Sequence, residues 1–213
     1  LGFGFGPVFE QADGLDYIQY LTPGVIGMSL LFGSMMNGMS LIWDKQFGFL
    51  KETLVAPVSR FNLLIGRSLG GSVISIIQGI IVLFVSLFIG YQLNYLAVIP
   101  LVILVMLLIS LTFTLFGNVI ATRVEDMEAF PTIMNFIIMP MFFLSGALFP
   151  LENLPEGVLA ITRVNPMTYG VNLLRSTMNV TFGINNLIDL GVMLFLILLL
   201  LFVGSMSFKK IET

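Results

Sequence analysis

The sequence alternates between long apolar stretches and short polar segments. Five stretches have the length that a membrane-spanning helix needs, and each lacks charged residues in its middle. Because backbone groups in lipid must be satisfied within the segment, these stretches predict α-helices. Residues 1–9 resemble the last turns of an earlier span. We expect complete spans over about residues 20–42, 68–89, 96–121, 132–149 and 190–208, with a kink at Pro140.

Composition supports a single transmembrane domain over residues 1–213. Hydrophobic residues make up 57% of the chain, charged residues only 10%, and the mean hydropathy is +1.03. Soluble domains carry about 25% charged residues, so the composition predicts an all-α integral membrane protein. The chain has no Cys and no His, which excludes disulfides, thiolate or imidazole metal sites and imidazole bases. The net charge of −3 argues against nucleic acid as a partner.

Lysine and arginine are distributed unequally between the predicted loops, and this asymmetry predicts orientation. Only Arg163 and Arg175 fall on one side of the membrane. The side that carries seven basic residues is expected to be cytoplasmic, and it includes the C-terminus. These seven are Lys45, Lys51, Arg60, Arg67, Arg123, Lys209 and Lys210.

Small residues recur at four-residue spacing in the first two complete spans, which lets helix backbones approach closely in lipid. Packing within one bundle is the favoured interpretation of any single pair, and a subunit interface is the alternative. The pairs are Ser29 with Gly33, Ser34 with Gly38, and Gly66 with Gly70. The triplet is Gly71, Ser75 and Gly79.

Ionisable residues are missing from the middle of every predicted span, and Asp189 lies only at the edge of the last one. Proton-coupled carriers and pumps usually need such groups at membrane depth. Uphill transport by this chain would therefore need energy supplied from elsewhere. An intramembrane protease centred on Ser145 is excluded because no His, and no Lys within a span, is present to activate the hydroxyl. The segment around Arg67 does not match a phosphate-binding loop.

Two loops carry helical patterns of their own. In the first, Phe47, Leu50 and Leu54 recur at helical spacing among polar residues, and Pro57 ends the pattern. Such a helix either lies in the headgroup layer or docks a soluble partner. In the loop over 150–186, Pro155 and the pair Asn165-Pro166 are helix-start signals. The second helix is expected to carry an apolar stripe of Met167, Val171, Leu174 and Met178. The two short helices either dip into the membrane rim or form a surface lid.

Four motifs run in the order found in ABC type-2 exporter permeases. The segment GFLKETLVAPVSR over 48–60 resembles the first cytoplasmic loop of that family. The segment FFLSGALFPLENLP over 142–155 is similar to its fourth-loop signature, and NPMTY over 165–169 with Arg175 resembles the stretch that follows. The acidic loop over 123–130 also fits. The resemblance implies a six-span permease that lacks here its N-terminal interfacial helix and most of its first span.

The resemblance also implies partners and sites. It implies a second permease copy or close relative, membrane lipids, and a separate ABC ATP-binding subunit that carries ATP and Mg on the cytoplasmic side, with no cofactor on this chain. It shifts the interpretation of the first loop from lipid contact to docking. The implied ATPase-docking coupling helix comprises Lys45, Phe47, Gly48, Leu50, Lys51, Glu52, Leu54, Pro57 and Arg60. The implied outer re-entrant gate comprises Ser145, Gly146, Pro150, Pro155, Asn165, Pro166, Tyr169 and Arg175.

The expected function is therefore the permease subunit of an ATP-driven exporter in a prokaryotic plasma membrane. It would not be an enzyme itself, and it would move an apolar or amphipathic substrate outward by alternating access. The alternative is a passive membrane anchor subunit without transport activity.

Overall fold

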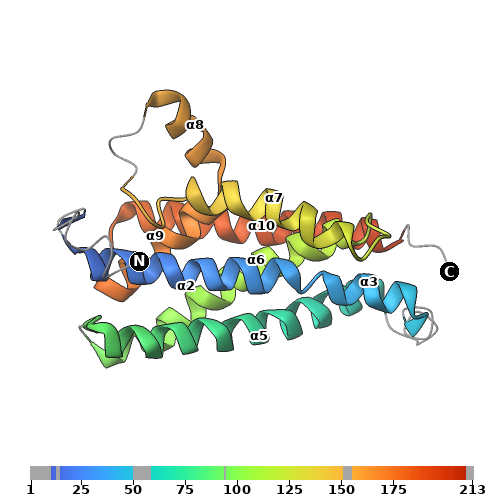
Figure 1. Cartoon of the computed structure of the whole chain (residues 1–213), viewed down its shortest axis with the longest axis horizontal. Helices are drawn as coiled ribbons and strands as arrows, with labels where there is room; N and C mark the ends of the chain where they lie inside the picture. The colour runs from blue at the N-terminus through green and yellow to red at the C-terminus, as the bar shows by residue number, and fades with distance from the viewer. Residues whose placement is uncertain (1–10, 13–14, 50–58, 94, 151–154, 210–213) are drawn as a thin grey trace.

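Helices form nearly all of the described chain in the computed structural model, which describes residues 11–12, 15–49, 59–93, 95–150 and 155–209. The long helices lie side by side in an elongated bundle, from which α8 projects (Figure 1). Two-residue strands β1 (Gln11–Ala12) and β2 (Leu15–Asp16) pair antiparallel before the first helix. The helices are α2 (Tyr17–Met36), α3 (Met39–Gln46), α5 (Arg60–Ile89), α6 (Ile99–Ala121, preceded by the 3-10 turn Leu96–Val98), α7 (Ala129–Phe143), α8 (Glu156–Val164), α9 (Pro166–Asn179) and α10 (Ile184–Lys209).

Four helical segments among the described residues are long and apolar enough to cross a membrane. They are Tyr17–Gln46, Arg60–Ile89, Leu96–Ala121 and Ile184–Phe208. This confirms the predicted all-α integral membrane class, and the third segment has the predicted bounds. The predicted stub over 1–9 lies outside the described residues.

The fourth predicted span, over 132–149, is wrong in its extent. Helix α7 begins at Ala129 and ends at Phe143, and the residues after it form turns. Its 15 residues reach about 22 Å, short of the roughly 30 Å of a bilayer core. The helix ends there because the chain turns back through Gly146, whose φ of 75° is left-handed. The apolar residues 144–149 therefore belong to a turn rather than to the helix.

The first complete span is interrupted rather than continuous over 20–42. A turn at Asn37 and Gly38 separates α2 from α3. Gly38 lies against the backbone of Gly117 in α6, where an added Cβ would be 2.6 Å from the Gly117 carbonyl oxygen. An added Cβ on Gly117 would in turn be 2.4 Å from the carbonyl oxygen of Met35. The interruption thus lies where two helix backbones touch.

Helix α5 extends eight residues beyond the predicted start of its span, from 68 back to 60. Ser59 caps it, because its Oγ accepts a hydrogen bond from the Asn62 amide at 3.2 Å. Gly90 ends it with a left-handed φ of 114°. The first two turns carry Arg60 and Arg67. Because these residues are charged, hydropathy alone does not reveal that the helix begins before the apolar stretch.

Small residues pack helices α2, α5 and α6 against one another, as the internal-packing interpretation expects. Gly33 faces Ser75 and Gln78. Gly71 faces Asn37, and Gly79 faces Leu30. Nearby, the Asn118 amide donates to the Ser68 hydroxyl at 3.1 Å inside the bundle. Gly66 and Gly70 differ, since nothing in the described chain lies within 4 Å of a Cβ added there.

The bundle has two ends with different character (Figure 1). The α3 end holds α3, the start of α5 and the last turns of α6 and α10. The α9 end holds α9, the turn over 144–149 and the start of α2. The described residues of the predicted coupling helix lie at the α3 end, and the gate residues around Gly146 and Asn165 lie at the α9 end.

Candidate docking and gate sites

The predicted docking segment is only partly within the described residues. Leu50, Lys51, Glu52, Leu54 and Pro57 lie outside them, so their helical pattern stays a prediction. Lys210, counted among the cytoplasmic basic residues, also lies outside. The structure does place the two borders of the segment, at α3 and at the start of α5.

The docking helix does not begin at Lys45 as expected. Lys45 belongs to α3, which ends at Gln46. The amide of Phe47 still donates to the Trp43 carbonyl at 2.9 Å, but Gly48 has a left-handed φ of 81°. A helix over 45–57 is thus not continuous at its first turn, because Gly48 breaks it.

Lys45 contacts the end of α6 rather than solvent. Its Nζ donates to the carbonyl oxygens of Ala121 and Thr122, each at 2.8 Å. The neighbouring Gln46 Nε2 donates to the Glu125 carbonyl oxygen at 3.0 Å. The end of α3 is therefore attached to the end of α6 and to the loop that follows it.

Arg60 and Arg67 make corresponding contacts from α5. Arg60 Nη1 donates to the carbonyl oxygen of Phe208, one residue before α10 ends, at 2.8 Å. Arg67 Nη1 lies 2.6 Å from the Asp44 carboxylate of α3. Arg67 Nη2 also donates to the Ser40 hydroxyl at 3.3 Å. Lys45, Arg60 and Arg67 thus each join two helices.

Aromatic side chains are exposed around the beginning of the docking segment. Phe47 is 67% exposed, Phe49 57% and Trp43 49%. Such apolar groups beside basic residues suit the membrane surface as well as a protein partner.

At the α9 end, the chain leaves α7 through a tight turn held by Ser145. The Ser145 Oγ donates to the Phe142 carbonyl oxygen at 2.6 Å and accepts from the Ala147 amide at 3.2 Å. Ser145 and Ala147 are fully buried. Ser145 therefore shapes the turn through these two contacts with the backbone.

The carbonyl oxygen of Gly146 is the point where three segments meet. It accepts hydrogen bonds from the Tyr20 hydroxyl at 2.8 Å and from Arg175 Nη2 at 2.9 Å. The Arg175 guanidinium also lies 3.8 Å from the centre of the Tyr20 ring, a cation–π contact. Gly24 of α2 touches the same turn, since an added Cβ would be 2.1 Å from the Ala147 carbonyl oxygen. We call Tyr20, Gly146 and Arg175 the outer latch, after the outer gate that the sequence predicts here.

Asn165 links the end of α7 to the start of α9. Its Oδ1 accepts from the Met167 amide at 3.0 Å, the contact expected of a helix cap, and Pro166 occupies the first helical position. Its Nδ2 donates to the Met141 carbonyl oxygen at 2.7 Å. One side chain thus satisfies backbone groups of two helices.

The two helices of the predicted gate differ in burial. The predicted apolar stripe of α9 is fully buried and consists of Met167, Val171, Leu174 and Met178. Helix α8 is largely exposed, with Val164 82% exposed. Tyr169 joins them, since its hydroxyl donates to the Arg163 carbonyl oxygen. Pro150 is half-buried and Pro155 is exposed just before α8, and neither belongs to the latch. Thus α9 is part of the bundle, while α8 projects from it (Figure 1).

Asn165→Ala should weaken the α7–α9 junction more than a simple cap loss does. Removal of a cap costs about 0.5–2 kcal/mol, and here a second carbonyl loses its donor as well. We expect a thermal unfolding midpoint clearly below that of Asn172→Ala, a half-buried asparagine within the same helix. Equal midpoints for the two purified variants would contradict the double role of Asn165.

Sequence reasoning missed Tyr20 and Gly24 as parts of the gate. Tyr20 lies 126 residues from its acceptor, and an aromatic residue at a span end is usual in any membrane helix. Gly24 belongs to no four-residue pair in the predicted interface. The signal in the sequence was only indirect, because Arg175 is one of just two basic residues predicted on that side of the membrane.

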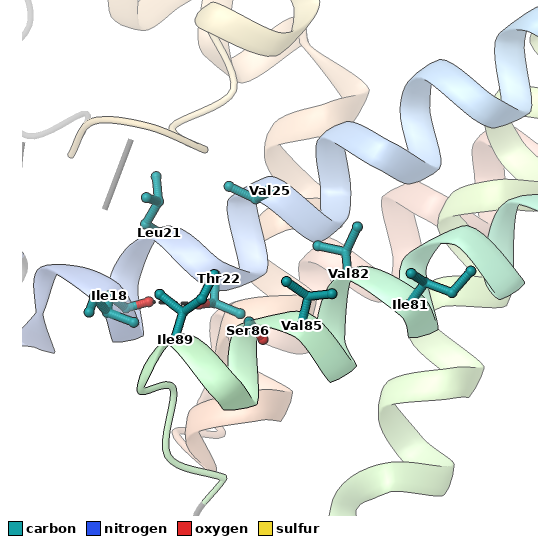
Figure 2. A pocket seen from close by; sticks show the side chains of 9 residues that line it. All are labelled: Ile18, Leu21, Thr22, Val25, Ile81, Val82, Val85, Ser86 and Ile89. Atoms are coloured by element: carbon teal, nitrogen blue, oxygen red, sulfur yellow. Dashed lines mark hydrogen bonds between the residues drawn. The ribbon is translucent and has the colours of Figure 1, made fainter. Parts of the chain in front are cut away.

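A cavity of about 400 Å³ lies between α2 and α5 towards the α9 end (Figure 2). Seven of its nine lining residues are aliphatic. The two hydroxyls are occupied within their own helices, because Thr22 Oγ1 donates to the Ile18 carbonyl at 2.8 Å and Ser86 Oγ to the Leu83 carbonyl at 2.7 Å. The walls are therefore effectively apolar. The lining residues are Ile18, Leu21, Thr22, Val25, Ile81, Val82, Val85, Ser86 and Ile89.

Known proteins share this sequence pattern. A transport permease of Cyanophora paradoxa, ycf38, is 29% identical over 223 residues, which cover 97% of the chain and 77% of the relative. The inner membrane transport permease YadH of Escherichia coli K12 is 27% identical over 161 residues, which cover 75% of the chain and 62% of the relative. YbhR of the same organism, named as a multidrug ABC transporter permease, is 27% identical over 157 residues, or 73% of the chain and 42% of the relative.

The family model described as ABC-2 type transporter matches residues 1–179, most of the chain. The match includes the docking segment, both motifs of the gate and α9, the features that the sequence motifs singled out. The apolar helices and the permease relatives agree with it. The chain therefore belongs to the ABC-2 type transporter family, as a multi-pass membrane permease.

Proposed function

We propose that the chain is the permease subunit of an exporter in which a separate ATPase subunit binds residues 45–60. The observation that supports this most directly is the attachment of both borders of that segment to spanning helices, through Lys45 and Arg60. A loop that only rested on lipid would not need such contacts. ATP and Mg would bind to the partner, on the cytoplasmic side, so that the α3 end faces the cytosol of a prokaryotic cell.

The proposed mechanism is alternating access by a rigid-body change between two arrangements. Closure of the ATPase subunits around ATP would push the docking segment at the α3 end. The helices attached to it would tilt, and the turn held by the outer latch would open at the α9 end. A second permease copy or close relative would form the other half of the path.

The substrate proposed is apolar or amphipathic. Charged residues of the described helices lie near helix ends, as Arg67 and Asp189 do. The cavity between α2 and α5 has apolar walls (Figure 2). A charged or strongly polar substrate would lose its hydration without finding a fixed counter-charge in such surroundings.

Leu50→Asp combined with Leu54→Asp is expected to abolish docking. Aspartates would replace the apolar residues of the predicted docking face, and their burial against a partner would be costly. The permease is co-expressed with its ATPase subunit, and co-purification and ATP hydrolysis in lipid vesicles are measured. We expect the variant to lose co-purification with the ATPase subunit. We also expect it to lose the stimulation of ATP hydrolysis that the wild-type permease gives.

The matched control places the same two charges at the α9 end. Leu96→Asp combined with Val164→Asp alters residues that are 78% and 82% exposed, and should leave co-purification intact. Unchanged ATPase stimulation in the docking variant would refute the docking assignment. Co-purification without substrate-stimulated hydrolysis or transport in wild type would support the passive anchor instead.

A further inference from the structure

Lys45 and Arg60 stand at the two borders of the docking segment, and each reaches a helix that the chain does not connect directly to that segment. Lys45 is bonded to the end of α6, 76 residues away. Arg60 is bonded to Phe208 of α10, 148 residues away. By covalent connection alone, the segment would move only α3 with α2 on one side and α5 on the other. The contacts of Lys45 and Arg60 would extend this movement to α6 and α10.

These contacts satisfy a physical need at the helix ends. The last carbonyls of a helix have no partner within it, and together they carry a partial negative charge. Helix α6 has no basic residue in its own last turn. The Lys45 ammonium supplies the missing donor and the compensating charge from outside the helix. A charge-assisted contact of this kind is stronger than a neutral hydrogen bond.

Helix α3 is attached along its length, which makes it suited to transmit force. At its start, Gly38 touches the Gly117 backbone of α6. At its end, Lys45 holds α6 and Asp44 pairs with Arg67 of α5. A turn at Asn37 and Gly38 connects it to α2. Movement of α3 is therefore shared with α6 and α5 through packed contacts.

We propose that Lys45 and Arg60 are positioning residues that transmit movement of the docking segment to α6 and α10, respectively. This inference rests on the proposed function, and it assigns these two residues to transmission within the permease rather than to the surface that contacts the ATPase. Loss of either contact should remove the response at the end of the helix that it holds, while the end of the other helix still responds.

Hydrogen exchange on the permease–ATPase complex in nanodiscs tests this assignment. Backbone exchange is compared with and without ATP at the ends of α6 (118–122) and α10 (205–208). We expect ATP to alter exchange at both ends in wild type. Lys45→Met should lose the response at α6 and keep it at α10, and Arg60→Met should show the reverse pattern. Lys45→Arg and Arg60→Lys, which keep the charge and the donors, should restore it.

Arg123→Met is the matched control, because Arg123 is an exposed basic residue beside the Lys45 acceptors. It should leave both responses unchanged. Co-purification of the ATPase shows that docking survives in each variant. Retention of both responses in Lys45→Met and Arg60→Met, or their loss in Arg123→Met, would overturn the transmission role while the proposed function stands. Absence of any response or co-purification in wild type would instead overturn the proposed function, and the inference with it.

Discussion

Gly117→Ala is expected to destabilise the bundle severely. An added Cβ would lie 2.4 Å from the Met35 carbonyl oxygen and 3.0 Å from the Met35 Cα, both backbone atoms of α2. Backbone cannot swing aside as a flexible side chain does, so α2 and α6 would have to separate. Overpacking of a core costs about 1–3 kcal/mol, and we expect the upper part of this range or more. The measurement is the thermal unfolding midpoint and the monodisperse yield in detergent.

Gly70→Ala is the control for this prediction. Nothing described lies within 4 Å of a Cβ added at Gly70, which also stands inside a helix. Because Ala favours helices over Gly by about 0.5–1 kcal/mol, the variant should be as stable as wild type or slightly more so. A similar loss in both variants would show that the contact between Gly117 and Met35 is not the cause.

Arg175→Met should loosen the outer latch. The substitution removes the charged donor to the Gly146 carbonyl and the cation–π contact with Tyr20. Hydrogen bonds that involve a charged group contribute about 1.5–3 kcal/mol, and we expect a loss of about 2 kcal/mol. Because the chain has no Cys, Ala147→Cys can report opening of the buried turn. Its labelling by a membrane-impermeant maleimide should be faster when Arg175 is replaced.

Arg163→Met is the matched control, since it removes the other basic residue of the same side. Its side chain is exposed, and its backbone carbonyl accepts a hydrogen bond from the Tyr169 hydroxyl. Labelling of Ala147→Cys and the unfolding midpoint should stay at their wild-type values. If the two arginine variants behaved alike, the effect would come from the lost charge and not from the latch.

Much of the helical architecture could be predicted because its signals are local. Apolar stretches free of charge predicted the spanning helices, since the bilayer imposes the same requirement on any sequence. Asn165 and Pro166 predicted the start of α9 to the residue, because a cap acts on amides two or three positions away. The stripe beginning at Met167 predicted the buried face of that helix.

The errors share a cause, which is dependence on distant contacts. The end of α7 at Phe143 and the interruption at Gly38 lie within apolar stretches, where hydropathy predicts that the helix continues. Both depend on the approach of other segments. Likewise, the contacts of Lys45 and Arg60 with the ends of α6 and α10 could not be predicted, because they join residues 76 and 148 positions apart.

Which segments cross the bilayer, and where α8 and α9 begin, thus follows from the order of residues along the chain. Which residues hold those helices together does not. The latch and the two basic contacts use backbone carbonyls as acceptors, and every residue has one. Only the packing of helices selects the carbonyl of Gly146 for Tyr20 and Arg175, or that of Phe208 for Arg60.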